Sequence, residues 1–409
     1  MSLDLLPAEV TADLWHDPAS YWRALSRAVQ DRPAPVAAIG VEALRRNALD
    51  LVVRGGGLPI RVASKSVRVR EVVDAVLRMP GYRGILAFTL AEALWLAEDH
   101  DDVVVGYPTA DRTALAALAA DERAAERVTL MVDDLAQLDL IDAVAPPTSR
   151  ARMRVAIDAD AGFRSRSLGH VGVYRSPVHA PAEVTALARV IADRPGFRLV
   201  GLMMYEAQIA GQPDDEGPAD PVIRWMQRRS ADELRHRRAA ITASLRDIAA
   251  LEFVNGGGTG SLESTAADES VTELTAGSGL LAGHLFDGYR SFDPAPAAAF
   301  ALDVVRKPRP DIATVLGGGW IASGPPTASR QPRPVWPPGL HTMPREAAGE
   351  VQTPLRGEAA RDLRIGDRVW FRHAKSGEAS ERVDQYHLVE NGRLVGVAPT
   401  YRGEGRAFL

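Results

Sequence analysis

Cysteine is absent from this 409-residue chain, and its absence removes several kinds of chemistry at once. Disulfides, thiol nucleophiles and zinc-thiolate sites are excluded, so any metal ion would need His, Asp or Glu ligands. No apolar run approaches the roughly 20 residues of a membrane-spanning helix. The N-terminal stretch MSLDLLPAEV carries acidic residues where a signal peptide would carry basic ones. We therefore expect a cytoplasmic protein that does not enter a membrane.

The chain also lacks a strong excess of charge of either sign. Its formal net charge of -5 provides no general attraction to nucleic acid or to a membrane surface, so the expected partner is a small molecule. The hydrophobic fraction of 46% and the length are typical of a globular protein with one large domain and one smaller domain.

Lysine is scarce. Of 48 basic residues, only Lys65, Lys307 and Lys375 are lysines, and the others are arginine. A coding bias toward arginine explains this scarcity, since it replaces any lysine whose only task is to be positive. Arginine cannot lose its proton in proteins, whereas a lysine amine can do so and then attack a carbonyl. Each remaining lysine is thus a candidate for chemistry, with chance survival as the alternative.

Short β-rich runs alternate with alanine- and leucine-rich stretches of helical spacing through most of the chain. This alternation predicts an α/β fold with parallel strands and helices outside them. Eight such strands between Ile60 and Gly277 match the number that closes a (β/α)8 barrel. A ninth run at 35–41 is expected to pair elsewhere. The eight runs lie at 59–65, 84–88, 102–107, 128–133, 153–160, 197–205, 251–258 and 271–277.

The composition changes near residue 293, where proline-rich segments and short alternating runs replace the helical pattern. This change predicts a small C-terminal β domain over 293–409, after a barrel domain over 35–292. We expect residues 1–34 to be an N-terminal extension that packs on the β domain or the barrel. The segment 206–230 is too long for a plain connection, so it is either an active-site loop or a solvated surface insertion.

Functional side chains of such barrels lie at the C-terminal ends of the strands, and Lys65 occupies such a position. A lysine there can form a Schiff base with the carbonyl of a substrate or of pyridoxal phosphate, and a surface salt bridge is the alternative. The sequence VNGGGTGS at 254–261 comes near the seventh strand, where barrels commonly bind phosphate. Its glycines let backbone N–H groups approach an anion and let a helix start there. Together the lysine and the glycine loop favour pyridoxal phosphate.

The motifs RVASKS, GVYRSPV (172–178), GLMMYEAQ (201–208), NGGGTGS and TELTAGS (272–278) follow one another along the chain. In this order they resemble the fold-type III pyridoxal phosphate enzymes. The resemblance is to the branch of D-threonine aldolases and D-serine dehydratases, which shares the alanine racemase barrel. It implies a TIM-type barrel with a small C-terminal β domain, and a homodimer.

The resemblance also implies cofactor-binding residues. Lys65 would form the Schiff base, and Tyr205 would lie beside the cofactor ring. Arg175 would lie near the ring hydroxyl or the substrate carboxylate, with Arg164 as its rival and a salt bridge as the alternative for either arginine. The implied phosphate-binding residues are Gly257, Gly258, Thr259, Gly277 and Ser278.

The resemblance also implies a divalent-metal site. In D-threonine aldolases and D-serine dehydratases, a histidine and, two residues later, a cysteine or aspartate look like the ligands of this ion. Alternate residues of a strand point the same way, so both could bind one ion. Here the positions hold His373 and Lys375, and a protonated lysine repels a metal ion. Either no metal binds, or Glu378 or His387 replaces the missing ligand. We hypothesise that Lys375 stands in for the metal beside the substrate's β-hydroxyl group, with His373 as a second catalytic residue; a surface lysine is the alternative.

The resemblance implies a lyase in which pyridoxal phosphate stabilises a carbanion at Cα. A D-configured β-hydroxy amino acid would then split into glycine and an aldehyde, or lose water. An amino acid racemase is the chemical alternative. A non-catalytic pyridoxal phosphate-binding homeostasis protein is the alternative outside enzymes, but such proteins resemble the bare barrel.

Overall fold

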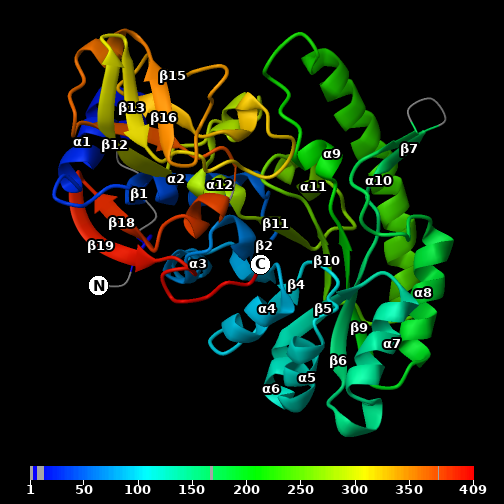
Figure 1. Cartoon of the computed structure of the whole chain (residues 1–409). Coiled ribbons are helices and arrows are strands. Elements are labelled where there is room, and N and C mark those ends of the chain that lie inside the picture. Colours follow the sequence, from blue (N-terminus) through cyan, green and yellow to red (C-terminus); the bar gives the residue numbers. More distant parts are fainter. Residues whose placement is uncertain (1–2, 7–12, 166–168, 376) are drawn as a thin grey trace. The chain divides into compact units, whose positions relative to one another are not determined.

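The computed structural model describes residues 3–6, 13–165, 169–375 and 377–409 (Figure 1). The chain forms two compact units, and neither is one continuous segment. Unit 1 comprises Met1–Asp50, Lys65–Met79 and Gly277–Ala407, and unit 2 comprises Leu51–Ser64, Pro80–Ala276 and Phe408–Leu409.

Within the described residues, unit 2 forms a closed barrel of eight parallel strands in the order β10-β11-β2-β3-β4-β5-β6-β9. This confirms the predicted TIM-type barrel and each of the eight predicted strands. Strands such as β5 are buried at every position, as expected of parallel strands covered on both faces. The strands are β2 (Ile60–Ala63), β3 (Tyr82–Ala87), β4 (Val103–Val105), β5 (Val128–Val132), β6 (Met153–Asp158), β9 (Phe197–Met204), β10 (Phe253–Gly256) and β11 (Glu273–Ala276).

Helices of unit 2 lie outside these strands, and α8 and α10 pack against each other beside β9 (Figure 1). Several begin where the sequence places a capping residue: Asp111 accepts hydrogen bonds from the backbone N–H groups of Thr113 and Ala114. The helices are α4 (Leu90–Leu96), α5 (Arg112–Ala120), α6 (Glu122–Arg127), α7 (Leu135–Val144), α8 (Pro181–Asp193), α9 (Ala207–Ala210), α10 (Asp220–Arg246) and α11 (Leu262–Ala266). A small hairpin of β7 (Phe163–Ser165) and β8 (Gly169–Val171) follows β6.

The prediction that 206–230 forms one loop is wrong. Helix α9 follows β9 almost directly, and α10 already begins at Asp220, which leaves 211–219 as the connection. Pro221 lies in the first turn of α10, where its fixed φ suits a helix and its missing N–H costs nothing. The cluster of Gly, Pro and Asp therefore marks a helix start as well as a turn.

An ion-pair network crosses the interior of the barrel. The Arg61 side chain is buried, and its Nη1 and Nε atoms each lie 2.8 Å from a carboxylate oxygen, of Asp102 and Glu273 respectively. Arg61 is the second residue of β2, Glu273 is the first residue of β11 and Asp102 precedes β4, so all three lie at the N-terminal ends of the strands, opposite to the end that carries functional residues in such barrels. Gly84 has a φ of +68°, and a β-carbon there would collide with the Arg61 guanidinium. The network therefore fills the end of the barrel at which the strands begin.

The described part of unit 1 contains a nine-stranded sheet built largely from the C-terminal third of the chain. The run predicted at 35–41 is β1, which pairs antiparallel with β12 and parallel with β18, so it does pair outside the barrel. The strands are β1 (Val36–Gly40), β12 (Ala298–Arg309), β13 (Ile312–Leu316), β14 (Arg333–Trp336), β15 (His341–Thr342), β16 (Gln352–Arg356), β17 (Arg368–Arg372), β18 (Gln385–Glu390) and β19 (Arg393–Pro399).

Helix α1 (Pro18–Ala28) covers part of this sheet. Its Tyr21 and Trp22 belong to one hydrophobic cluster with Trp370 of β17, which is fully buried. The other helices of unit 1 are α2 (Val41–Arg54), which ends in unit 2, α3 (Arg70–Leu77) and the single turn α12 (Ser278–Leu281).

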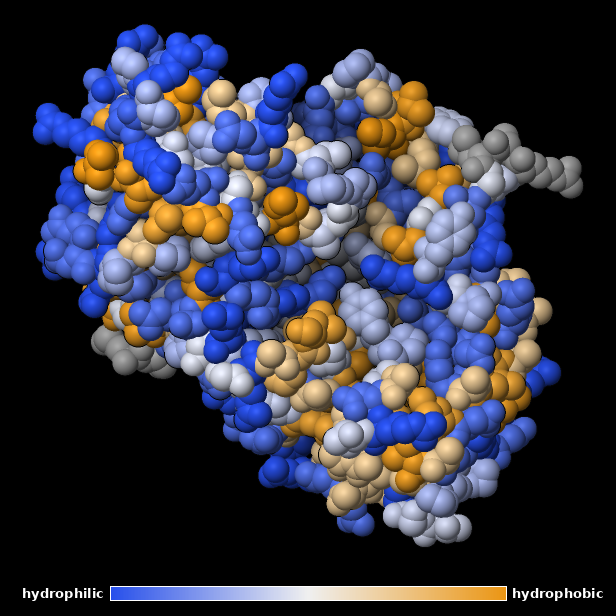
Figure 2. All heavy atoms as spheres, viewed as in Figure 1, coloured by the Kyte–Doolittle hydropathy of each residue, from blue (hydrophilic) through white to orange (hydrophobic). Residues whose placement is uncertain are grey.

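None of the helices in the described ranges is long and apolar enough to cross a membrane. Hydrophobic residues on the visible surface form small groups separated by hydrophilic ones (Figure 2).

Candidate active site

Lys65 lies two residues beyond the end of the barrel strand β2, whereas the sequence predicts it as the last residue of that strand. It lies in a single 3-10 turn, Ser64–Ser66, and its side chain is half-buried. Its carbonyl oxygen accepts a hydrogen bond from Arg68 Nε at 3.1 Å. Arg68 has a φ of +53° and is buried, so the chain after Lys65 turns sharply and is held there. By chain order, the amine is thus attached at the catalytic end of a barrel strand.

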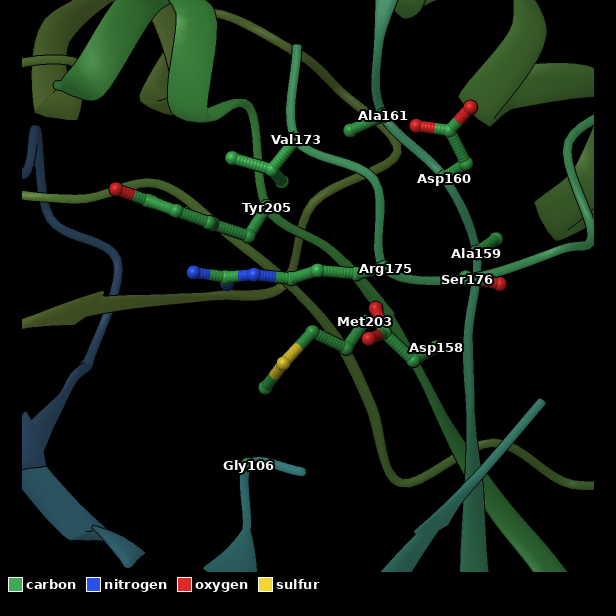
Figure 3. Close-up of a pocket in the computed structure, with 10 residues that line it drawn as sticks. All are labelled: Gly106, Asp158, Ala159, Asp160, Ala161, Val173, Arg175, Ser176, Met203 and Tyr205. Carbon is green, nitrogen blue, oxygen red and sulfur yellow. The ribbon is translucent and has the colours of Figure 1, made fainter. Parts of the chain in front are cut away.

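A pocket in unit 2 brings together Arg175 and Tyr205 (Figure 3). The two side chains extend alongside each other, and the Arg175 guanidinium carbon lies 5.5 Å from the centres of both the Tyr205 and Tyr107 rings. Burial raises the pKa of Tyr205 to about 12, so its phenol is neutral at physiological pH. The other lining residues are Gly106, Asp158, Ala159, Asp160, Ala161, Val173, Ser176 and Met203.

Asp158, the last residue of β6, lines this pocket and was not predicted from the sequence. Burial raises its pKa to about 7, and the negative charges of Asp133 and Asp160 act in the same direction, against the charge of Arg175. Its carboxyl group can therefore gain or lose a proton near neutral pH. The signal that could have found it is an aspartate at the C-terminal end of a barrel strand, in IDADAG.

The carboxylate of the second aspartate, Asp160, is held by neighbouring basic side chains. Its carboxylate points away from the pocket (Figure 3) and lies 2.9 Å from Arg164 Nη2, 3.2 Å from His170 Nε2 and 3.1 Å from His179 Nδ1. Of the two rival arginines, Arg175 lines the pocket and Arg164 makes a salt bridge.

The glycine loop after β10 packs directly on Tyr205. A β-carbon on Gly258 would lie 2.9 Å from the Ala210 side chain and 3.1 Å from the Tyr205 ring, and Gly257 has a φ of +85°. The close approach expected of these glycines is therefore present. The following helix α11 has only five residues, so its N-terminus contributes little to the binding of an anion.

A buried carboxylate, Glu206, supports this loop and was missed in the sequence. It accepts hydrogen bonds from the Gly257 amide at 3.3 Å, from the Ser261 hydroxyl at 2.9 Å and from the Thr265 hydroxyl. Arg238 neutralises it from 3.2 Å. The Gly258 amide in turn donates to the Ser261 hydroxyl. The Glu206 carboxylate and the Ser261 hydroxyl thus hold the loop in shape. In the sequence, only the position of Glu206 next to Tyr205 points to this role.

The remaining predicted phosphate-binding residues differ in their environment. Thr259 is buried, and its carbonyl oxygen accepts a hydrogen bond from Arg54 at 2.6 Å. Gly277 and Ser278 follow β11 and belong to unit 1, where Gly277 caps the single turn α12.

His373 and Lys375 do not lie in a strand, so the argument from alternating strand residues is wrong. Strand β17 ends at Arg372 because the chain bends at 374–375. His373 is buried, and its Nε2 atom has no hydrogen-bond partner among the residues that the structure describes. Burial lowers its pKa to about 4, assisted by the charge of Arg372.

The residues here do not fit a divalent-metal site. Across the described ranges, no three His, Asp or Glu residues are grouped so as to hold a metal ion. His387, one possible replacement ligand, lies on β18 with Nδ1 at 3.2 Å from the Ala37 carbonyl oxygen. Lys375 occupies the position of the implied second ligand and would repel a cation.

Comparisons with known proteins give a consistent result. Residues 39–269 match the family model described as alanine racemase, N-terminal domain. A D-threonine aldolase from Arthrobacter sp. is 28% identical over 289 residues, which cover 67% of this chain and 68% of that protein. A D-threonine aldolase structure from Filomicrobium marinum has a TM-score of 0.74 at 20% identity, covering 91% of this chain and 96% of that one. A D-threo-3-hydroxyaspartate dehydratase structure from Delftia sp. HT23 has a TM-score of 0.65 at 20% identity, covering 90% and 97%.

Proposed function

Because the chain belongs to the alanine racemase N-terminal domain family, we propose that it is a pyridoxal phosphate-dependent lyase acting on a D-configured β-hydroxy amino acid. The relatives named D-threonine aldolase and D-threo-3-hydroxyaspartate dehydratase support this substrate class. Retro-aldol cleavage and dehydration are the two reactions in question.

The observation that carries the proposal is the position of Tyr205. Its ring meets Gly258 of the glycine loop, where a side chain would not fit, and it also lies beside Arg175. An aromatic ring, a cation and a glycine loop in contact suit a flat, phosphorylated cofactor. The residues therefore fit pyridoxal phosphate.

We propose a role for each group. The Lys65 amine would hold the cofactor aldehyde, and after release from it would accept or return a proton at Cα. The phosphate would bind at Gly257, Gly258 and Thr259, and the amides of Gly257 and Gly258 would then exchange Glu206 and Ser261 for phosphate oxygens. Arg175 would face the ring hydroxyl or the substrate carboxylate. When bound, the cofactor supplies an electron sink for charge that develops at Cα.

Borohydride reduction followed by peptide mapping tests the role of Lys65. Reduction of the holoenzyme should fix the cofactor on the peptide that contains Lys65, and Lys65→Ala should abolish the label. Lys307→Ala is the matched control because its amine donates to the backbone carbonyls of Ala360 and Pro310. A label on Lys307 or Lys375 would contradict the assignment.

Incubation with amino acids tests the reaction class. D-threonine should release an aldehyde, or D-serine should release ammonia, while both enantiomers of alanine stay unchanged. Racemisation of alanine would favour the racemase, and no reaction with any of them would favour a non-catalytic binding protein. The expected homodimer and cytoplasmic location remain predictions, and light scattering of the holoenzyme tests the former.

A further inference from the structure

The backbone around Lys375 lies directly beside that of Lys65, and both belong to unit 1. The hydroxyl of Ser380 donates to the Val67 carbonyl oxygen at 2.8 Å, and Arg68 pairs with Glu381 at 2.7 Å. A β-carbon at Gly377 would collide with the Lys65 carbonyl oxygen. Only glycine allows this approach, so the sequence around Lys375 is built to pack on the Lys65 turn.

A second segment holds residues 373–375 from another direction. The backbone N–H groups of His284 and Leu285 donate to the carbonyl oxygens of His373 and Ala374 at 2.9 and 3.0 Å. A β-carbon on Gly283 would lie 2.6 Å from the carbonyl oxygens of Ala374 and Lys375. The backbone that carries His373 and Lys375 is therefore fixed on two sides.

Three buried acceptor atoms in this region have no hydrogen-bond partner among the described residues: His373 Nε2, His284 Nδ1 and Glu378 Oε2. His284 Nε2 donates to the Gln331 carbonyl oxygen at 2.8 Å, which leaves Nδ1 of the neutral ring as an acceptor. The hydrogen bond between His373 and the Ala298 backbone raises the His373 pKa, so the ring donates in it, and the unpaired Nε2 of the neutral ring is likewise an acceptor. Buried acceptors without partners are rare in proteins, and each calls for a water molecule, an ion or a ligand that carries a donor.

Lys375 supplies the complementary group. Its ammonium is a donor without acceptor capacity, and its charge acts on Glu378, whose other carboxylate oxygen accepts a hydrogen bond from the Ser323 amide at 3.1 Å. A ligand that contacts both side chains would donate to His373 Nε2 and accept from Lys375. A hydroxyl group does both, whereas a carboxylate or an alkyl group does not.

We propose that His373 and Lys375 bind the β-hydroxyl group of the amino acid substrate directly, without a metal ion, and that Glu378 positions Lys375 through its charge. This inference rests on the proposed lyase function and deepens it. It also accounts for the disagreement between these residues and the metal site that the resemblance implies, because a lysine stands at the sequence position of the second ligand.

Metal content tests the inference without any turnover. The purified holoenzyme is dialysed against Mn²⁺ or Zn²⁺, and the bound ion is measured by mass spectrometry. The wild-type chain should retain no stoichiometric ion, whereas Lys375→Asp should gain one that is lost again when His373→Ala is added. A stoichiometric ion in the wild type that disappears in His373→Ala would overturn the proposal. Failure of Lys375→Asp to gain an ion would also count against it, since it would show that His373 Nε2 is not available beside position 375.

Ligand affinity provides the second test, read from the change in cofactor absorbance on titration with D-serine and D-alanine. Lys375→Met should weaken D-serine binding roughly 10- to 100-fold, the value of one charge-assisted hydrogen bond, and leave D-alanine binding unchanged. Lys307→Met is the matched control and should change neither. Equal effects of Lys375→Met on both ligands would refute a contact with the β-hydroxyl group.

These readouts separate two failures. If the wild type binds D-serine but converts neither D-serine nor D-threonine, the lyase proposal fails while the binding site for the hydroxyl group stands. If turnover is present but is abolished by a chelator, the metal-independent site fails while the lyase proposal stands.

Discussion

Asp158→Asn should stabilise the cofactor-free protein, and increasingly so as the pH rises. Burial moves the pKa of Asp158 from 3.8 to about 7. Between these values the unfolded chain has lost this proton and the folded chain has kept it, so wild-type stability falls with rising pH and levels off above about pH 7. Asparagine has nearly the same shape and cannot ionise, so the variant lacks this loss.

The magnitude follows from the same pKa values. At 1.36 kcal/mol per pKa unit, a change from 3.8 to about 7 corresponds to about 4 kcal/mol. The side chain is only partly buried by surface area, and solvent screening reduces the expected effect to about 2 kcal/mol. The free-energy difference between variant and wild type should therefore be small near pH 4 and reach about 2 kcal/mol near pH 8.

Urea denaturation followed by circular dichroism, at several pH values between about 5 and 8, measures this difference. Asp17→Asn is a control of opposite sign. The Asp17 carboxylate accepts hydrogen bonds from the hydroxyl and the amide of Ser20 at 2.6 and 3.2 Å, and these lower its pKa. The ionised Asp17 carboxylate therefore stabilises the folded wild type at every pH above the pKa that Asp17 has in the unfolded chain, and Asp17→Asn loses this contribution. A difference for Asp158→Asn that is the same at pH 5 and pH 8, or that favours the wild type at pH 8, would refute the reasoning.

Three further predictions concern side chains and glycines with specific neighbours. Arg61→Met should cost about 3–5 kcal/mol in urea denaturation because it leaves Asp102 and Glu273 without their partner in the barrel; a loss below about 1 kcal/mol would show that the network is solvated. Gly258→Ala should weaken pyridoxal phosphate binding at least tenfold in an absorbance titration, and unchanged affinity would remove the glycine loop from the proposed site. Gly377→Ala should lower turnover while the far-ultraviolet spectrum stays unchanged, and full activity would mean that the close approach to the Lys65 turn does not matter.

Much of the barrel could be predicted from the sequence because its signals are local. Each buried strand is a short apolar run between helical stretches, so the eight strands could be identified without knowing their neighbours. Lys65 and the glycine loop were identifiable because each directly follows such a run. Turn residues were misinterpreted because the same residue types occur in loops and at the starts of helices. The Gly, Pro and Asp cluster before Asp220 predicted a loop, but a helix begins there.

Other features depend on contacts between residues far apart in the chain. The raised pKa of Asp158 comes from burial and from Asp133 and Asp160, and Glu206 is recognised as a support of the glycine loop only through Arg238 and Ser261. None of these pairs leaves a pattern in the sequence.

The sequence by itself determined the alternation of strands and helices, the kind of chemistry open to a chain without cysteine, and the lysines that could take part in it. Only the tertiary structure decided that β17 ends before His373, that acceptors around it lack partners within the described part of the chain, and that Gly377 packs on the Lys65 turn. The reason is physical: hydrophobic periodicity acts over neighbouring residues, whereas burial, pKa and unpaired hydrogen-bonding groups depend on what the folded chain brings together.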